Sequence, residues 1–592
     1  MLRKTLLPAL LAMLAAGSAT AQHKDCGTDA LHEQLLLQNP DYARHTRQDR
    51  NNWAQRQNLL STAKIITSGT DTTYEVPVVI HVVHSGEPVG DFYNPSVAAI
   101  DSMLDYLNKT WSATWPGYPS AGSGGVHLNI QFARAKRTPD CNPSDGINRV
   151  DGRSLSGYDA YGVVYSTSLP GPGDSAVKSL SRWPAHDYYN IWIVKYLDGV
   201  TGYYAGYAYF PGPNILDGTV IAARYIRPLT AGKDDFWYTI PHELGHAFGL
   251  QHTFNGSSGT GSCPPNANCA VDGDGICDTE PHEFRDGTCL SGTNMCTGKP
   301  YAGVQYNMMN YSTCFDRFTP LQKERVHFSL KTYRMGLVNS LGATAPDPGF
   351  TPPLPACIPK TVISNNTDTG PHNLSLADMQ TSSFGYAPDG RKGYIDRSCM
   401  QAAAHLQRGK TYTLSVSVGY LPERVKAWID FNNDGTFQSS EVVLNHVGTF
   451  ATPNEVHTAT FAVPATAILK KNLRMRIMSD VYDAAEPTAC GDLQYGQTED
   501  YSVVIEEPSA ILPVAGIPEV KLYPNPATDL VNIDIQYPVD ISIWSLDGRR
   551  LLLQENSRQA HLDTLADGLY LLRLTDPATG ATLGHAKILK RH

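Results

Sequence analysis

Apolar and polar positions alternate with different periods along the chain and divide it into successive blocks. The N-terminal block is polar apart from one helical stretch at 29–37. A β-branched run at 76–84 then predicts a buried strand, and an amphipathic helix is expected around 96–109. Further strands are expected at 126–133 and 189–194. This alternation of strand and helix continues to about residue 340 and predicts an α/β (α+β) domain over residues 73–340.

The second half of the chain has a different pattern. A Pro-rich segment at 346–355 excludes both a helix and a central strand and therefore indicates a linker. Beyond it the pattern is almost purely short strands and turns, with a second break near Pro508. The clearest of these strands are expected at 411–418, 425–430 and 473–478. We therefore expect a linker at 341–356 and two all-β sandwich domains, at 357–506 and 518–592.

The N-terminus and the composition place the chain outside the cytoplasm. A basic start at 1–4, an apolar run at 6–16 and a small-residue cleavage pattern at 19–21 predict a secretory signal peptide over 1–21. No later run reaches the roughly 18 apolar residues of a spanning helix, so no transmembrane segment is expected. The 47 basic and 57 acidic residues give a net charge of -10 without a basic cluster, which argues against a nucleic-acid partner.

One segment, PHELGHAFGLQH at 241–252, has the spacing of a catalytic metal site. On a helix, His242 and His246 lie one turn apart on the same side, so both imidazoles can reach one Zn²⁺. Glu243 lies between them, where it can hold a water and take its proton. Gly249 allows the chain to leave the helix sharply and to return His252 as a third ligand. Three protein ligands with an open fourth position are typical of catalytic rather than structural zinc.

This segment, H-E-x-x-H-x-x-G-x-x-H, resembles the motif of the metzincin metallopeptidases. Metzincins carry a Met-turn beneath the metal, and the sequence NMMNYS at 307–312 is similar to it. The resemblance implies that Met309 is the turn methionine. It also implies that Tyr311 lies beside the metal, as a resting ligand and as a hydrogen-bond donor to the tetrahedral intermediate.

Further segments resemble one metzincin family, the pappalysins, over roughly residues 72–335. They lie at 206–212, 217–221, 252–254, 272–279 and 318–322. The resemblance implies a strand through Gly206, Tyr207 and Ala208 that pairs with an extended substrate. Some pappalysins select a basic residue after the cleaved bond with an acidic residue just beyond the Met-turn. The first carboxylate there is Asp316, so this preference is not carried over.

The predicted function is therefore that of a secreted zinc endopeptidase, acting on proteins or peptides and made as a latent precursor. Glu243 is expected to act as general base, with Tyr311 stabilising the oxyanion. The alternative from another class is a surface adhesin or binding protein in which the middle β-sandwich carries the main role. Cleavage that Glu243→Gln abolishes would discriminate between them.

The cysteine count bears on latency. The chain has eleven cysteines, so at least one is unpaired within it. Cys26 precedes the helical stretch of the expected pro-segment, 22–72, and several pappalysin-like precursors are kept latent by such a cysteine on the metal. Leaving Cys26 unpaired permits up to five disulfides, one of which then crosses between the blocks on either side of the linker. An ordinary disulfide or a free thiol is the alternative.

Two acidic segments offer oxygen ligands for structural Ca²⁺. The first holds Asp272, Asp274, Asp278 and Glu280, and the resemblance favours calcium there over a solvated acidic loop. The second follows the D-x-N-x-D-G…E spacing of a calcium loop, although Asn-Asp-Gly is also a good hairpin turn. Its expected ligands are Asp430, Asn432, Asp434 and Glu441.

The two C-terminal blocks also resemble known modules. The middle block, through GQTEDY at 496–501, is similar to GEVED β-sandwich domains. The final block, with LYPNPA at 522–527 and GLY at 568–570, resembles the C-terminal sorting domain of type IX secretion. That resemblance implies the type IX secretion machinery as a partner. It also implies export through the periplasm and outer membrane of a Gram-negative bacterium to the cell surface or medium. The fold class expected for the whole chain is thus a metzincin α/β (α+β) catalytic domain followed by two all-β sandwiches.

Overall fold

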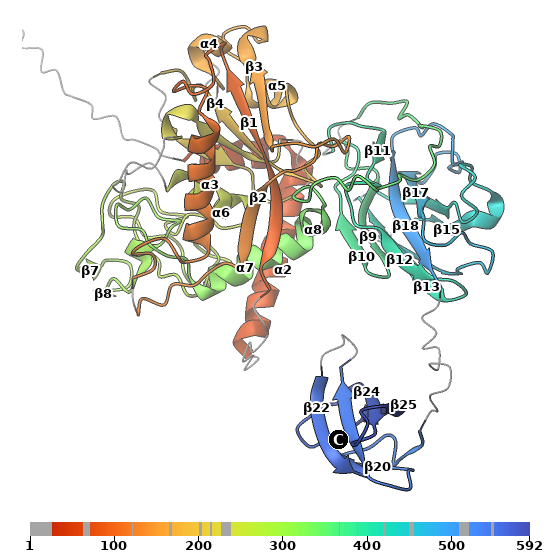
Figure 1. Cartoon of the computed structure of the whole chain (residues 1–592). Helices are drawn as coiled ribbons and strands as arrows, with labels where there is room; N and C mark the ends of the chain where they lie inside the picture. Colours follow the sequence, from red (N-terminus) through yellow and green to blue (C-terminus); the bar gives the residue numbers. More distant parts are fainter. Residues whose placement is uncertain are drawn as a thin grey trace, which may run out of the picture. The chain divides into compact units, whose positions relative to one another are not determined.

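The computed structural model describes most of the chain (Figure 1). The described residues are 26–62, 72–120, 122–164, 168–200, 204–212, 216–226, 238–365, 367–387, 389–419, 421–448, 455–507, 520–545 and 550–591. The signal peptide predicted at 1–21 lies outside them. The chain divides into two compact units, residues 1–505 and 506–592, and each is described by itself. Within the described residues, no helix has both the length and the apolar character needed to cross a membrane.

Most helices belong to the N-terminal half of the first unit. They are α1 (Thr28–Gln38), α2 (Pro40–Thr62), α3 (Val97–Trp111), α4 (Tyr158–Tyr161), α5 (Asp174–Ser179), α6 (Thr239–Ala247), α7 (Pro320–Tyr333) and α8 (Met335–Asn339). Helix α1 covers the helical stretch expected at 29–37, and α3 covers the amphipathic helix expected at 96–109. Ser96 caps α3 by accepting a hydrogen bond from the Ala99 N–H at 3.2 Å, which explains where that helix begins.

A mixed sheet forms the centre of this half. Its strands are β1 (Tyr74–His84), β2 (Ile130–Arg134), β3 (Ile147–Asp151), β4 (Tyr189–Val194), β5 (Gly206–Ala208) and β6 (Thr219–Ala222). Their order is β2-β1-β4-β6-β5, with β3 also paired to β1. All of these pairs are parallel except β5, which runs antiparallel to β6 and ends the sheet. A separate short hairpin joins β7 (Thr293–Asn294) to β8 (Lys299–Pro300).

The burial of the central strand explains its β-branched sequence. Residues 76–83 of β1 are all buried, as expected of a parallel strand covered on both faces. Helix α3 packs against β2 and against α6, so α6 is held over the sheet beside the antiparallel edge strand β5. The helix that carries the metal-site motif therefore rests on one continuous hydrophobic core.

One strand expectation is wrong over its first half. The apolar run at 126–133 predicted a strand throughout, but β2 begins only at Ile130. Asn129 adopts a left-handed conformation with φ of 55°, which a strand cannot continue through. The backbone before it bonds elsewhere, since the Leu128 N–H donates to the Trp111 carbonyl at 2.7 Å.

The remainder of the first unit is a β-sandwich. One sheet has the order β10-β9-β13-β16, and the other has the order β11-β18-β17-β14-β15, with β12 paired to β18. The strands are β9 (Pro371–Leu376), β10 (Met379–Ser382), β11 (Tyr394–Asp396), β12 (Ala404–Gln407), β13 (Thr411–Val418), β14 (Glu423–Ile429), β15 (Val442–Val447), β16 (Val456–Ala462), β17 (Asn472–Val481) and β18 (Gln497–Glu506). Apolar side chains from both sheets form a separate core. The predicted fold class is confirmed for this block.

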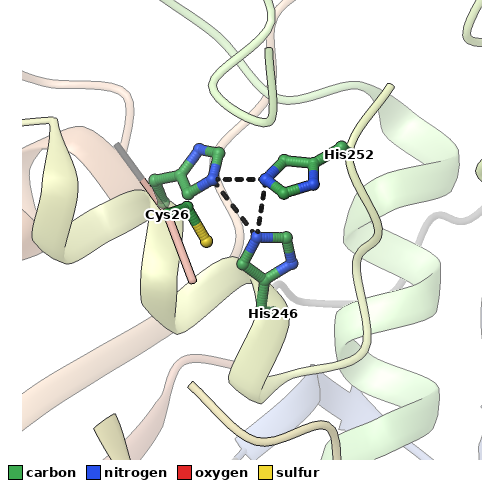
Figure 2. Close-up of side chains that lie close together, drawn as sticks. Cys26, His246 and His252 are labelled. Carbon is green, nitrogen blue, oxygen red and sulfur yellow. Dashed lines mark hydrogen bonds between the residues drawn. The ribbon is translucent and has the colours of Figure 1, made fainter. Parts of the chain in front are cut away.

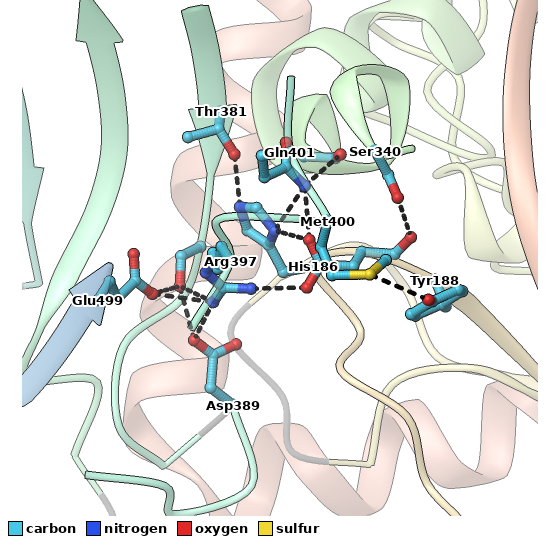
Figure 3. A network of polar contacts seen from close by, with 12 residues as sticks. His186, Tyr188, Ser340, Thr381, Asp389, Arg397, Met400, Gln401 and Glu499 are labelled. Atoms are coloured by element: carbon cyan, nitrogen blue, oxygen red, sulfur yellow. Dashed lines mark hydrogen bonds and ion pairs between the residues drawn. The ribbon is translucent and has the colours of Figure 1, made fainter. Parts of the chain in front are cut away.

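A buried ionic network joins the sandwich to the first sheet's domain (Figure 3). The guanidinium of Arg397, which has no exposed surface, contacts three carboxylates at 2.8–3.0 Å. Asp187 comes from the segment before β4, whereas Asp389 and Glu499 belong to the sandwich. Thr381 adds a hydrogen bond to His186 at 2.6 Å. The sandwich is therefore packed against the domain rather than joined to it only by the linker.

Five disulfides are present in the described residues. They pair Cys141 with Cys399, Cys263 with Cys296, Cys269 with Cys277, Cys289 with Cys314 and Cys357 with Cys490. The first crosses between the two blocks, as the count predicted when Cys26 is left out. Cys26 is the free cysteine, and it is buried.

The second unit is a smaller β-sandwich with its own core. Its sheets have the orders β19-β20-β23 and β22-β21-β24-β25. The strands are β19 (Leu522–Tyr523), β20 (Leu530–Ile533), β21 (Val539–Trp544), β22 (Arg550–Ser557), β23 (Gln559–His561), β24 (Gly568–Thr575) and β25 (Thr582–Lys590). The expectation of a second all-β sandwich is confirmed.

Candidate metal centre

Helix α6 and the turn after it bring three histidines together. His242 and His246 lie on α6, and all residues of that helix are buried. Gly249 follows with φ of 93°, and a Cβ there would lie 2.4 Å from the Ser329 hydroxyl. Only glycine satisfies both the left-handed backbone and the close approach. The chain turns at this point and returns His252 to the side of α6 that carries the other two imidazoles.

The Nε2 atoms of these histidines form a nearly equilateral triangle (Figure 2). His242 Nε2 lies 3.1 Å from His252 Nε2 and 3.2 Å from His246 Nε2, and the third side is also 3.2 Å. Three nitrogens bound to one tetrahedral Zn²⁺ at 2.0–2.1 Å would be separated by about 3.3 Å. The triangle therefore has the size that such an ion requires.

Each imidazole is oriented by a hydrogen bond on its other nitrogen. The Nδ1 atoms of His242 and His246 face the carbonyls of Met308 at 2.8 Å and Leu250 at 2.7 Å. The Nδ1 of His252 faces a carboxylate oxygen of Asp29 at 2.7 Å. All three partners are acceptors, so each Nδ1 carries the proton and each Nε2 presents a lone pair. Three lone pairs this close repel one another, and a cation between them removes that repulsion. The donor set therefore fits a divalent metal.

The protonation state agrees with this arrangement. Burial, with His252 nearby, lowers the pKa of His242 to about 3. Burial likewise lowers the pKa of His246 well below its ordinary value. Both rings are neutral near pH 7, which is the form that binds metal ions.

The segment at 307–312 lies directly beneath α6. Met309 is fully buried, and a Cβ on Gly245 would lie 2.3 Å from its sulfur, so this glycine gives the methionine room against the helix. The Met309 carbonyl accepts a hydrogen bond from the Thr253 N–H at 3.2 Å, which connects the turn to the residue directly after His252. The ring of Tyr311 lies 4.8 Å from that of His252. The sequence-predicted methionine and tyrosine are thus both brought to the histidine cluster.

The N-terminal segment (residues 26–29) fills the space in front of the histidines. Cys26 and the three histidines offer ligand atoms that all lie within 4.8 Å of one another, and all four residues are buried. The Cys26 thiol also lies 3.3 Å from the carboxylate of Glu243. The backbone carbonyl of Cys26 accepts a hydrogen bond from the Tyr311 hydroxyl at 3.2 Å. Burial, and then the Glu243 carboxylate, raise the pKa of this thiol well above its ordinary value.

The same segment lies along the edge strand β5. Cys26 forms a parallel bridge with Gly206, and the Gly27 N–H donates to the Gly206 carbonyl at 2.9 Å. The hydroxyl of Thr28 accepts from the Ala208 N–H at 3.0 Å. Of the three residues expected to contact substrate, Tyr207 has its side chain buried toward Asp174. The groups of β5 that bond to the N-terminal segment are backbone groups of Gly206 and Ala208.

Two contacts of the N-terminal segment were missed from the sequence. The Thr28 hydroxyl lies 3.1 Å from a carboxylate oxygen of Glu243, and Asp29 orients His252 as described above. Their position directly after Cys26 is the signal that could have indicated them. If Cys26 lies at the histidine cluster, its neighbours in the chain must lie beside the same groups.

Helix α2 attaches this N-terminal region to the domain at a distance from the histidines. Asp49 forms a bidentate ion pair with Arg325 of α7. The side chains of Trp53 and Gln57 donate to the Gly275 carbonyl at 2.9 and 2.7 Å. The N-terminal region is thus held at the surface around Gly275 as well as at the histidine cluster.

The expected calcium ligands at 272–280 are not gathered into one group. Two clusters of described residues bring three or more His, Cys, Asp or Glu ligand atoms within 4.8 Å of one another. Neither cluster contains any of the four expected calcium ligands. Asp274 accepts from Thr279, Asp278 accepts from Thr319 and Glu280 accepts from the Ala302 N–H. Asp272 accepts from the Asn268 N–H. Calcium binding there remains a prediction from the resemblance.

The second expected calcium loop is more compact. Asp430 and Glu441 are buried, and both carboxylates accept backbone N–H groups of the loop. Asn432 and Asp434 are bonded to each other at 3.0 Å. These hydrogen bonds close the loop, and calcium binding there remains a prediction.

Comparison with known proteins agrees with a metallopeptidase domain followed by two β modules. The peptidase M43 family, described as "Pregnancy-associated plasma protein-A", matches residues 173–331. The GEVED domain matches residues 424–504, and the secretion system C-terminal sorting domain matches residues 521–585. The chain therefore contains a pappalysin-type metallopeptidase domain, a GEVED domain and a C-terminal sorting domain.

Similar proteins include extracellular metalloproteases of fungi. One from Neurospora crassa is 26% identical over 344 residues, which is 56% of this chain and 98% of the relative. One from Pyricularia oryzae is 29% identical over 248 residues, 41% of this chain and 78% of the relative. These findings support a secreted metallopeptidase.

Two solved structures, of promirolysin and of mirolysin, are among those to which the chain is similar. A point mutant of Tannerella forsythia promirolysin is 24% identical, with a TM-score of 0.40, over 55% of this chain and all of that one. Mirolysin in complex with a compound is 27% identical, with a TM-score of 0.37, over 47% of this chain and all of that one.

Proposed function

We propose that this protein is a zinc-dependent endopeptidase, exported by the type IX route of a Gram-negative bacterium and made as a latent precursor. The observation that carries the proposal is the triangle of Nε2 lone pairs on His242, His246 and His252, with Glu243 beside it. The metallopeptidase family implies a metal, and the three imidazoles fit Zn²⁺ in size and protonation. Bound zinc supplies a Lewis acid that polarises the scissile carbonyl and makes a water molecule more acidic.

The protein's own groups perform the proton transfers and position the peptide. Glu243 is buried next to the histidines, so its carboxylate can take a proton from the attacking water and deliver it to the leaving nitrogen. Tyr311 holds a hydroxyl close to the same site and can donate a hydrogen bond to the developing oxyanion. The backbone of β5 offers an edge on which an extended peptide can pair as an added strand.

Latency follows in this proposal from the N-terminal segment. It pairs with β5 where the substrate is expected, and its carbonyl at Cys26 accepts the hydroxyl of Tyr311. Its thiol lies among the three histidines, where a cation would favour the thiolate and offset the raised pKa of the metal-free thiol. Removing residues 22–72 would open the edge strand and the metal site together.

The test is cleavage of a peptide library by the matured protein and its Glu243→Gln variant. We expect the variant to keep its zinc but to lose about 10²–10⁴-fold of the rate, the usual contribution of a general base. Glu324→Gln, at a half-buried position of α7 whose ion pair with Arg56 is lost with the pro-segment, is the matched control and should leave the rate of the matured protein unchanged. Equal rates for Glu243→Gln and the wild type would refute the assignment of the base. Cleavage that persists with a zinc chelator would refute the metallopeptidase itself.

A further inference from the structure

The sandwich has an open side at which its two sheets end. Strand β15 is the last strand of one sheet and β16 the last of the other, and the two strands lie in contact. His446 lies on β15 and His457 lies on β16. Among the described residues no backbone pairing joins these two end strands, and the two histidines meet between them.

The two imidazoles contact each other directly. Their Nδ1 atoms are 2.6 Å apart, and the rings meet edge to face with centroids 4.8 Å apart. Glu455 directly precedes β16, and its carboxylate lies beside the two imidazoles. One ligand atom from each of the three residues lies within 4.8 Å of the other two. It is the second of the two such groups among the described residues, and the peptidase site uses none of its members.

The burial of His457 makes this cluster unlike a surface histidine pair. His457 has no exposed surface, and its Nε2 has no hydrogen-bond partner among the residues that the structure describes. A buried imidazole beside a second imidazole and a carboxylate is a donor set typical of metal sites. His446 is exposed and Glu455 half-buried, which leaves the cluster open to solvent on one side.

We propose that His446, Glu455 and His457 bind a zinc-class divalent cation, separate from the peptidase site. Two imidazole nitrogens and one carboxylate oxygen form a donor set that suits such ions, with the fourth position open to water. A tetrahedral ion would separate the two Nδ1 atoms to about 3.3 Å, which needs a small outward movement of the exposed His446 ring. When the ion binds, the Nδ1 proton between the two rings moves to Nε2 of the ring that carries it, so each Nδ1 presents a lone pair and both imidazoles stay neutral. The bound ion thereby joins the end strands of the two sheets.

The proposal is tested by the zinc content of the full chain after equilibrium dialysis. We expect the wild type to hold one zinc more per chain than His446→Ala, whatever the occupancy of the peptidase site. His446 is exposed, so its removal should not disturb folding. His405→Ala, another exposed histidine in the same sandwich, is the matched control and should bind as the wild type does.

A second variant and a second readout separate this site from the peptidase. Glu455→Gln keeps the size of the side chain and should weaken the additional zinc by about tenfold or more. Added zinc should raise the melting temperature of the wild type and of His405→Ala by more than that of His446→Ala, because the additional ion joins the two sheets. Equal zinc content in His446→Ala and the wild type would overturn the proposal and leave a hydrogen-bonded histidine pair. Peptide cleavage measured after removal of the pro-segment from the same samples reports on the peptidase site independently.

Discussion

The contact between Thr28 and Glu243 leads to a specific prediction about latency. The Thr28 hydroxyl lies 3.1 Å from the carboxylate of Glu243 and accepts from the Ala208 N–H at 3.0 Å. It therefore connects the proposed general base to the edge strand in the precursor. Thr28→Val replaces the hydroxyl with a methyl group of similar size and removes both hydrogen bonds without changing the packing.

The magnitude follows from the kind of bond that is lost. A hydrogen bond to a charged group contributes about 1.5–3 kcal/mol, and each 1.4 kcal/mol is a factor of ten in an equilibrium constant. The open fraction of the precursor should therefore rise about 10- to 150-fold in Thr28→Val. The Ala208 N–H left without its acceptor adds to this effect. Thr28→Ser retains the hydroxyl and is the matched control.

The assay is the ratio of the precursor's initial cleavage rate to that of the matured enzyme, measured before self-processing begins. Thr28→Val should raise this ratio, Thr28→Ser should leave it near the wild-type value, and Cys26→Ala should raise it as well if the thiol holds the segment on the metal. A role for the Thr28 hydroxyl would be refuted if the Thr28→Val precursor is as latent as the wild type while the Cys26→Ala precursor cleaves peptides. Full latency in both variants would mean that occlusion of the cleft by the rest of the pro-segment is sufficient.

Three further outcomes are expected. Tyr311→Phe in the matured enzyme should lower kcat about 10²–10³-fold with little change in KM, as for loss of one oxyanion donor, and steady-state kinetics would show it. Arg397→Met should destabilise the first unit by about 3–5 kcal/mol, because it leaves buried carboxylates without their cation; urea unfolding measures this, and an unchanged midpoint would contradict it. Added Ca²⁺ should raise the melting temperature of the wild type by more than that of Asp430→Asn, and an equal rise in both would exclude calcium binding by the loop at 430–441.

The local part of the metal centre could be predicted from the sequence because its geometry is set by a helix and one glycine. His242 and His246 are brought together by helical spacing alone, and Gly249 is needed where the chain turns back toward His252. The strands of the sandwich were also predictable, since alternation over 411–418 matches β13. Where a left-handed residue interrupts an apolar run, as Asn129 does, the pattern overestimates the strand.

The contacts made across the fold could not be predicted in this way. Asp29 lies far from His252 in the sequence, and nothing in its local pattern identifies an imidazole partner. The Arg397 network is similar, because burying a guanidinium among carboxylates is costly unless tertiary packing places all of them together. Because each of the two blocks has an odd number of cysteines, the sequence indicates one disulfide between the blocks when Cys26 is left out. It does not indicate which cysteines form that disulfide, and the fold selects Cys141 and Cys399.

The N-terminal region combines a short blocking segment with a remote attachment. Residues 26–29 reach the histidines, Glu243, Tyr311 and β5, yet four residues alone bury too little surface to remain bound. Helix α2, through Asp49 and the contacts at Gly275, supplies further contacts and keeps the segment at a high effective concentration. Weakening α2 should therefore release the site, although the side chains of Asp49, Trp53 and Gln57 bond to Arg325 and Gly275 rather than to the histidines. In this arrangement residues 26–29 make the specific contacts that occlude the metal site, whereas the time for which they stay bound depends on the attachment of helix α2.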